Sequence, residues 1–146
     1  MKHLIHTLLL VAFVIVGFSA CSDKSIIRDF QKNARDKQII GLWTNNSYGK
    51  PHTSFRQYHA NGELWTCFDP VYNKEGKIER FKTVRKSAYY YTHGDTLFIY
   101  SPPTLITRGE ITKYLYKIDK DVLSLWGYIP TLGFSKEVDR TYLKVE

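Results

Sequence analysis

The hydrophobic pattern divides the chain into three stretches. Residues 8–18 form an unbroken apolar run, whose length lies within the ~7–15 residues typical of a secretory signal peptide and below the ~20 that a membrane-spanning helix needs. In residues 25–37, Ile26, Phe30 and Ala34 recur at a spacing of four. This spacing predicts a short amphipathic helix, with a solvated spacer as the alternative. After Gln38 the pattern becomes that of β-strands.

Beyond Gln38, short runs rich in β-branched and aromatic residues alternate with turn residues. Asn61-Gly62 is the strongest hairpin signal, and His93-Gly94-Asp95 and Asp119-Lys120-Asp121 indicate two further turns. We therefore predict an all-β fold, a single antiparallel up-and-down barrel of about eight strands with a short N-terminal helix. The candidate strands, one of which is open to interpretation as a loop, are Ile39–Thr44, Ser54–Ala60, Glu63–Phe68, Lys77–Val84, Ser87–Thr92, Thr96–Ser101, Ile111–Ile118, Val122–Gly127 and Val138–Val145.

Two of the predicted hairpins are built alike. Period-two alternation predicts one interior face, made of Tyr89, Tyr91, Leu97 and Ile99 in the first hairpin and of Tyr114, Tyr116, Leu123 and Leu125 in the second. Either Leu64 or Trp65 is predicted to face the interior with them. Rings of this size leave two alternatives open, a lumen filled by side chains and a cup for an apolar or amphipathic ligand. The candidate ligand-binding residues are Tyr58, Trp65, Tyr89, Tyr91, Tyr114, Tyr116, Trp126, Tyr128 and Phe134.

Residues 126–134 form an unusual segment, because they are rich in large apolar side chains although Gly127, Pro130 and Gly133 interrupt them. Connecting segments are normally polar and solvent-exposed. We therefore expect one of three roles for this segment. It is part of a binding rim, a plug folded into the barrel, or a docking surface for another envelope protein.

Composition and charge narrow the choice of partner. Removal of residues 1–20 leaves residues 21–146, enough for one domain, and the loss of Lys2 lowers the formal net charge from +7 to +6. A charge of this size suits a solvated surface, or contact with an anionic membrane or an anionic polysaccharide. The basic residues form no long run and no nucleic-acid-binding motif is present, so we expect no nucleic-acid partner.

The segment Phe18-Ser19-Ala20-Cys21 resembles the lipobox of bacterial lipoproteins, in which small residues precede an obligatory cysteine. The resemblance implies cleavage before Cys21 and lipidation of that cysteine. It also implies anchoring in the cell envelope, with the outer membrane as the expected site. The chain then divides into a signal peptide (residues 1–20), a lipidated tether with the short helix (21–38) and the barrel domain (39–146). Cys67 is the one remaining cysteine, and we expect it to be buried.

Gly41-Leu42-Trp43, at the start of the first β run, resembles the Gly-x-Trp opening of the lipocalins and related calycins. The segment from Tyr58 through Gly62 to Leu64 is similar to a hairpin of bacterial lipocalin-like lipoproteins. The resemblance implies an eight-stranded barrel whose closed end is plugged by Trp43. It also implies that a basic residue late in the chain, matched here to Arg140, packs on that tryptophan.

The chain contains no recognisable catalytic triad, phosphate-binding loop or metal-ligand pattern, so we expect no enzymatic activity, no metal and no cofactor. Glu63 and Glu110 are the carboxylates to examine for a catalytic role. An inhibitor of host lysozyme is disfavoured, because both proteins would be basic. We expect a lipid-anchored envelope protein that binds a small apolar or amphipathic molecule. The alternative is a subunit that docks on another envelope protein through residues 126–134.

Overall fold

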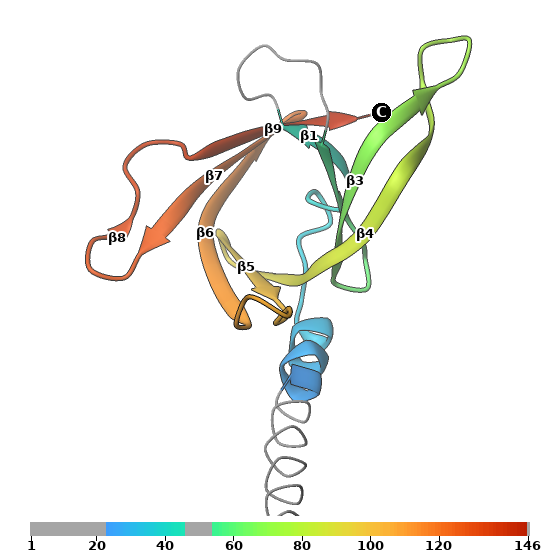
Figure 1. The fold of residues 1–146 in the computed structure, drawn as a ribbon. Coiled ribbons are helices and arrows are strands. Elements are labelled where there is room, and N and C mark those ends of the chain that lie inside the picture. Colours follow the sequence, from blue (N-terminus) through green and yellow to red (C-terminus); the bar gives the residue numbers. More distant parts are fainter. Residues whose placement is uncertain (1–22, 46–53, 146) are drawn as a thin grey trace, which may run out of the picture.

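The computed structural model describes residues 23–45 and 54–145. The predicted signal peptide and Cys21 lie outside these ranges. Within them, one helix covers residues 23–32 and nine strands follow it (Figure 1). No helix in the described part of the chain is both long enough and apolar enough to cross a membrane.

The strands form an antiparallel sheet that closes on itself (Figure 1). From β1 to β7 each strand pairs with the next, and β9 pairs with both β7 and β1, which closes a ring of eight strands. The short β8 pairs with the end of β7 outside the ring. The predicted up-and-down arrangement is therefore confirmed. The strands are β1 (Gly41–Asn45), β2 (Ser54–Tyr58), β3 (Glu63–Tyr72), β4 (Ile78–His93), β5 (Thr96–Ser101), β6 (Glu110–Asp119), β7 (Val122–Ile129), β8 (Gly133–Phe134) and β9 (Arg140–Val145).

β4 differs from the predicted strands, because one long strand replaces the two runs Lys77–Val84 and Ser87–Thr92. Up to Ala88 this strand pairs with β3 alone, and most of its residues there are exposed. Residues 84–87 of β4 are exposed without alternation, so no buried face imposes a period of two there. The hydrophobic pattern therefore did not reveal that the strand is continuous.

The helix packs on the outside of the barrel, against β4 and β5. Phe30 is 5% exposed, and its ring meets the edge of Tyr91 at 4.8 Å and the ring of Tyr100 at 5.8 Å. Ile26 and Ile27 pack against the same cluster. This confirms the predicted amphipathic helix over the solvated spacer, because the spacing of Ile26 and Phe30 turns both toward one face.

The prediction that Tyr89 and Tyr91 face the barrel interior was wrong. The register pairs Tyr89 with Tyr100 and Tyr91 with Phe98, and these four rings lie under the helix. A two-residue turn, Gly94-Asp95, joins β4 to β5. Across such a turn an odd-numbered residue pairs with an even-numbered one, so Tyr89 and Tyr91 do not share a face with Leu97 and Ile99.

Tyr90 takes the interior position in that hairpin. It pairs with Ile99 and belongs to the interior cluster with Leu97. The second hairpin agrees with the prediction, because Tyr116 pairs with Leu125 and both contribute to the interior cluster. The complete buried part of that cluster is Ile39, Trp43, Tyr58, Leu64, Ala88, Tyr90, Leu97, Ile99, Leu123, Leu125 and Tyr142.

One end of the barrel is closed by residues 33–40, which follow the helix. The Thr92 amide donates to the Ala34 carbonyl at 3.1 Å, and the Asp36 amide donates to the Thr92 hydroxyl at 2.7 Å. The Tyr116 hydroxyl donates to the Asp36 carboxylate at 3.0 Å. The segment is thereby fixed to both β4 and β6, and these bonds satisfy polar groups that it would otherwise bury unpaired.

Trp43 fills this closed end. It is fully buried, and its indole N–H donates to the Ile39 carbonyl at 2.7 Å. The basic group on its ring is Lys144, whose Nζ lies 5.4 Å from the ring centroid. The match of Arg140 to this position was therefore wrong, because the register places Trp43 opposite Lys144. Arg140 lies four residues earlier on β9, about 13 Å away along the strand.

Candidate functional site

The side chains that face the barrel interior become polar toward the end opposite the closed one. The pair Tyr58 and Leu64 belongs to the interior cluster, and two residues further along the same face the pair is Arg56 and Thr66. On β9, Tyr142 is followed at the same spacing by Arg140. Side chains two residues apart on a strand share a face. The strand period therefore places two arginines in the mouth of the barrel.

A cavity of about 260 Å³ lies in this mouth, between β1, β2, β3 and β9. Arg56, Thr66, Arg140 and Tyr142 are among the residues that line it. The Arg56 guanidinium carbon lies 5.5 Å from the centroid of the Tyr142 ring. Aromatic faces attract cations, so the ring holds the guanidinium group at the cavity wall.

A second, larger cleft of about 630 Å³ opens where β6 and β7 separate. Their last paired residues at this end are Tyr114 and Gly127, so residues 110–113 of β6 have no β7 partner. β7 continues to Ile129 and turns into β8 instead. The walls of the cleft include Glu110, Thr112, Tyr114, Tyr128, Ile129 and Arg140.

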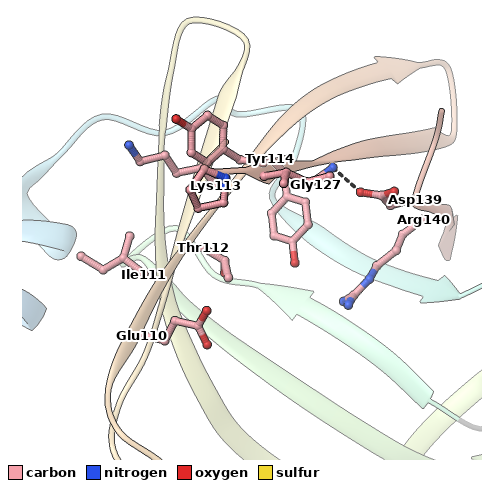
Figure 2. Close-up of a pocket in the computed structure, with 11 residues that line it drawn as sticks. Glu110, Ile111, Thr112, Lys113, Tyr114, Gly127, Asp139 and Arg140 are labelled. Carbon is pink, nitrogen blue, oxygen red and sulfur yellow. Dashed lines mark hydrogen bonds between the residues drawn. The ribbon is translucent and has the colours of Figure 1, made fainter. Parts of the chain in front are cut away.

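Arg140 lines both cavities, which places them beside each other. Figure 2 shows its guanidinium group extending toward the side of β6 that carries Glu110, Thr112 and Tyr114. Its guanidinium carbon lies 5.9 Å from the Tyr114 ring centroid. The neighbouring Asp139 accepts a hydrogen bond from the Gly127 amide, which fixes the start of β9 against β7. The two cavities thus form one open end with a shared cation.

The charge of this open end is mainly positive. In the described ranges neither Arg56 nor Arg140 forms an ion pair with a carboxylate. The ion pair found there joins Lys86 to Glu63, with Nζ and Oε1 2.9 Å apart. Arginine does not deprotonate in proteins, so both charges persist at every physiological pH. Glu110 supplies one negative charge at the edge of the larger cleft. Asp139 supplies a second negative charge there and Lys113 a third positive one, so the cations outnumber the carboxylates and favour an anionic group in the open end.

Tyr58 brings a polar atom to the boundary between the filled half and the mouth. It is 1% exposed, and its hydroxyl makes no well-aligned hydrogen bond among the described residues, although the Arg56 side chain lies close enough to interact with it. Burial raises the pKa of Tyr58 to about 12, and the neighbouring Arg56 opposes that rise. Tyr142 and Tyr114 are its other electrostatic neighbours. A buried hydroxyl without a partner is unfavourable, and here it lies beside the cationic mouth.

The remaining predicted binding residues are dispersed. Tyr116 bonds to Asp36 near the closed end. Leu64 rather than Trp65 belongs to the interior cluster, and Trp65 lies outside, where its indole N–H donates to Glu63 at 3.0 Å. Trp126 pairs with Leu115 on the opposite face from Leu125. Of the predicted ligand-binding set, Tyr58, Tyr114 and Tyr128 therefore border the mouth or its cleft.

Within the segment 126–134, Trp126 and Gly127 still pair with β6, and residues 128–134 form a hairpin of the end of β7 and β8 that projects from the ring (Figure 1). Tyr128 and Phe134 face each other across it, with ring centroids 5.2 Å apart. Leu132, at its tip, is 79% exposed. The prediction of an inward plug was wrong, because the pairing of β7 with β8 leads this segment away from the lumen.

Glu63 does not have the environment of a catalytic acid. Hydrogen bonding to Lys86 lowers the pKa of Glu63, whereas a general acid at neutral pH needs a raised value.

No known protein family, curated protein or solved structure matches this chain. The candidate functional site is therefore the open end of the barrel.

Proposed function

We propose that the protein is a lipid-anchored cell-envelope lipoprotein whose barrel binds a small amphipathic molecule at its open end. The observation that carries this proposal is the unequal filling of the interior. Large side chains occupy the closed half, and two adjoining cavities of about 630 and 260 Å³ occupy the open end. Ligand sites typically enclose roughly 300–1,000 Å³.

The chemistry of the mouth favours an anionic head group. Arg56 and Arg140 offer several N–H donors, which suit a carboxylate or a phosphate. Tyr114, Tyr128 and Ile129 offer apolar surface in the adjoining cleft for the rest of the molecule. A wholly apolar ligand fits less well, because it would take water from the two guanidinium groups without replacing its hydrogen bonds.

Native mass spectrometry of the mature protein, purified from its own host in mild detergent, tests whether a ligand is carried. We expect a reproducible additional mass that is lost on denaturation. The same protein is then titrated with dodecanoate, dodecyl phosphate and dodecanol, which share an alkyl chain and differ in head group. A bare mass together with no binding of any of the three compounds contradicts the proposed ligand-binding function.

Arg56→Gln and Arg140→Gln test the head-group assignment. Each removes one charged donor from the mouth, so we expect each to weaken binding of the anionic compounds by about tenfold. Arg80→Gln is the matched control, because it removes the same charge from an exposed position on β4. Equal effects of all three substitutions would show that net charge, rather than the mouth, attracts the ligand.

The anchoring part of the proposal is supported by the apolar run before Cys21 and by its similarity to a lipobox. Cys21→Ala tests it in the host, with a clickable palmitate analogue as the label. We expect the unchanged protein to incorporate the label and to sediment with membranes, and the variant to lose the label. Label incorporation by Cys21→Ala would contradict the assignment of this cysteine.

A second candidate function, docking on another envelope protein, is favoured by the projecting β7–β8 hairpin. Tyr128, Ile129 and Leu132 are 42%, 44% and 79% exposed, and clustered exposed apolar residues commonly mark interaction sites. Leu132→Asp separates the two functions, because it changes the tip of the hairpin and not the arginines. Loss of a stable envelope complex with unchanged ligand binding would support docking as an additional function.

A further inference from the structure

The connection between β5 and β6, residues 102–109, carries two adjacent aliphatic side chains in full contact with solvent. Leu105 is 106% exposed and Ile106 is 94% exposed. They occupy a well-formed turn, because the Thr104 amide donates to the Thr107 carbonyl at 3.0 Å and the Thr107 amide donates to the Thr104 hydroxyl at 3.1 Å. The turn therefore presents both side chains together at its tip.

The base of this connection adjoins the first described residue of the helix. The hydroxyl of Tyr100, near the end of β5, donates to the Asp23 carboxylate at 2.6 Å. Gly109, at the other end of the connection, lies so close that a Cβ there would be 3.0 Å from the same hydroxyl oxygen. Cys21 precedes Asp23 by two residues, and two extended residues span at most about 7 Å. A lipid attached to Cys21, as proposed above, would therefore join the chain within reach of this connection.

The same connection belongs to the open end of the barrel. β6 begins directly after it with Glu110, which lines the larger cleft. The helix starts here at Asp23 and leads to the closed end, where Ala34 bonds to Thr92. The start of the helix, the Leu105–Ile106 tip and the ligand mouth therefore share one end of the molecule.

We propose that this end faces the membrane and that Leu105 and Ile106 insert into the lipid surface. The inference rests on the proposed lipid anchor and deepens the proposed ligand-binding function, because a mouth held at the bilayer takes its amphipathic ligand from the lipid phase. Arg108 beside the tip and Lys24 and Arg28 on the helix are exposed. Asp23, Asp29 and Glu110 carry the opposite charge at the same end, so the inference rests on the exposed apolar tip and on the position of the proposed anchor.

The orientation is tested with the full mature, acylated protein in vesicles of phosphatidylethanolamine and phosphatidylglycerol. The environment-sensitive fluorophore NBD is attached to Leu105→Cys, and Cys67, which is fully buried, contributes little labelling. The matched control is Lys117→Cys, at an exposed position near the other end of β6. It lies about 23 Å along the strand from Glu110, away from the proposed membrane-facing end. Unsubstituted protein gives the background, and flotation of the vesicles measures attachment.

We expect NBD at position 105 to emit at shorter wavelength in vesicles and to be quenched by lipids with a shallow spin label, at a depth of ~5–10 Å. NBD at position 117 is expected to stay in water. Protein that floats with the vesicles while position 105 remains in water overturns the inference and leaves the anchor intact. Protein that does not float with the vesicles overturns the proposed anchor and the inference together. The proposed ligand binding is tested separately, by native mass spectrometry and titration.

Discussion

Arg56 and Tyr58 illustrate how two residues on one strand face determine the character of the site. They are separated by the strand period, and each belongs to a different half of the lumen. Tyr58 packs edge-on against Tyr90 at 4.9 Å within the filled half. Its hydroxyl, however, makes no well-aligned hydrogen bond and has the Arg56 side chain as its polar neighbour. A polar ligand group in the mouth would give that hydroxyl a partner.

Replacing Tyr58 with Phe removes the unpaired hydroxyl and keeps the ring. Without ligand, we expect the free energy of unfolding to rise by about 1 kcal/mol, because an unsatisfied buried group costs ~1–3 kcal/mol. Tyr90→Phe is the contrasting variant, since the Tyr90 hydroxyl donates to the His59 carbonyl at 2.8 Å. That variant is expected to lose about 1 kcal/mol. Urea unfolding of both variants measures the difference, and equal losses would show that the Tyr58 hydroxyl does have a partner.

At the scale of elements, the helix stabilises the barrel from outside. It buries Phe30 against Tyr89, Tyr91 and Tyr100, and the segment that follows it closes one end of the lumen. A short helix has little stability by itself in water. The helix therefore depends on this aromatic contact, and the closing segment depends on the helix for its position.

Phe30→Ala is expected to lower the free energy of unfolding by about 3 kcal/mol, within the range for buried phenylalanines. The neighbouring Gln31→Ala is the control, because Gln31 is exposed and surface substitutions usually change stability by less than about 0.5 kcal/mol. Urea unfolding gives both values, and hydrogen exchange at the Thr92 amide shows whether the closing segment opens with the helix. An effect of Phe30→Ala as small as the control would mean that the helix is dispensable.

The elements also show how far the sequence predicts this structure. The hairpin around Asn61-Gly62 and the alternation in β6 and β7 follow from local rules, so they are predicted correctly. The face of Tyr89 was missed, because pattern alone did not give the turn length. Arg56 was missed as a site residue although it lies two positions before Tyr58, because a charged residue at an inward position was not expected in a core.

At the scale of the whole molecule, the site exists because the ring closes tightly at one end and loosely at the other. β9 pairs with β1 and β7, but its pairing with β7 stops at Arg140. Beyond that residue β7 leaves the ring to pair with β8, and the cleft opens between β6 and β7. The same departure creates both the open mouth and the exposed hairpin, so one irregularity in the sheet supplies both candidate surfaces.

Tyr58, which is buried, and Tyr116, which is half-buried, make the stability of the whole fold sensitive to alkaline pH. Burial raises the pKa values of Tyr58 and Tyr116 to about 12, whereas an unfolded tyrosine ionises near 10. Below pH ~10 both states keep the proton and the contribution to stability is complete. Between pH ~10 and ~12 the hydroxyl ionises first in the unfolded chain, so the free energy of unfolding falls. The loss is about 3 kcal/mol for a rise of two pKa units at the fully buried Tyr58, and smaller at the half-buried Tyr116, where solvent screens the interaction.

Urea unfolding at pH 8, 9.5 and 11.5 measures this loss, and Tyr58→Phe assigns part of it to one residue. We expect the unchanged protein to keep its stability up to pH 9.5 and to lose it steeply at pH 11.5. The variant is expected to lose less stability, because it lacks the hydroxyl that ionises in the unfolded chain. The ionisation of lysines at high pH is common to both proteins and cancels in the comparison. Identical pH profiles of the two proteins would mean that the Tyr58 hydroxyl ionises in the folded barrel as readily as in water. That outcome would contradict the raised pKa of Tyr58 that its burial implies.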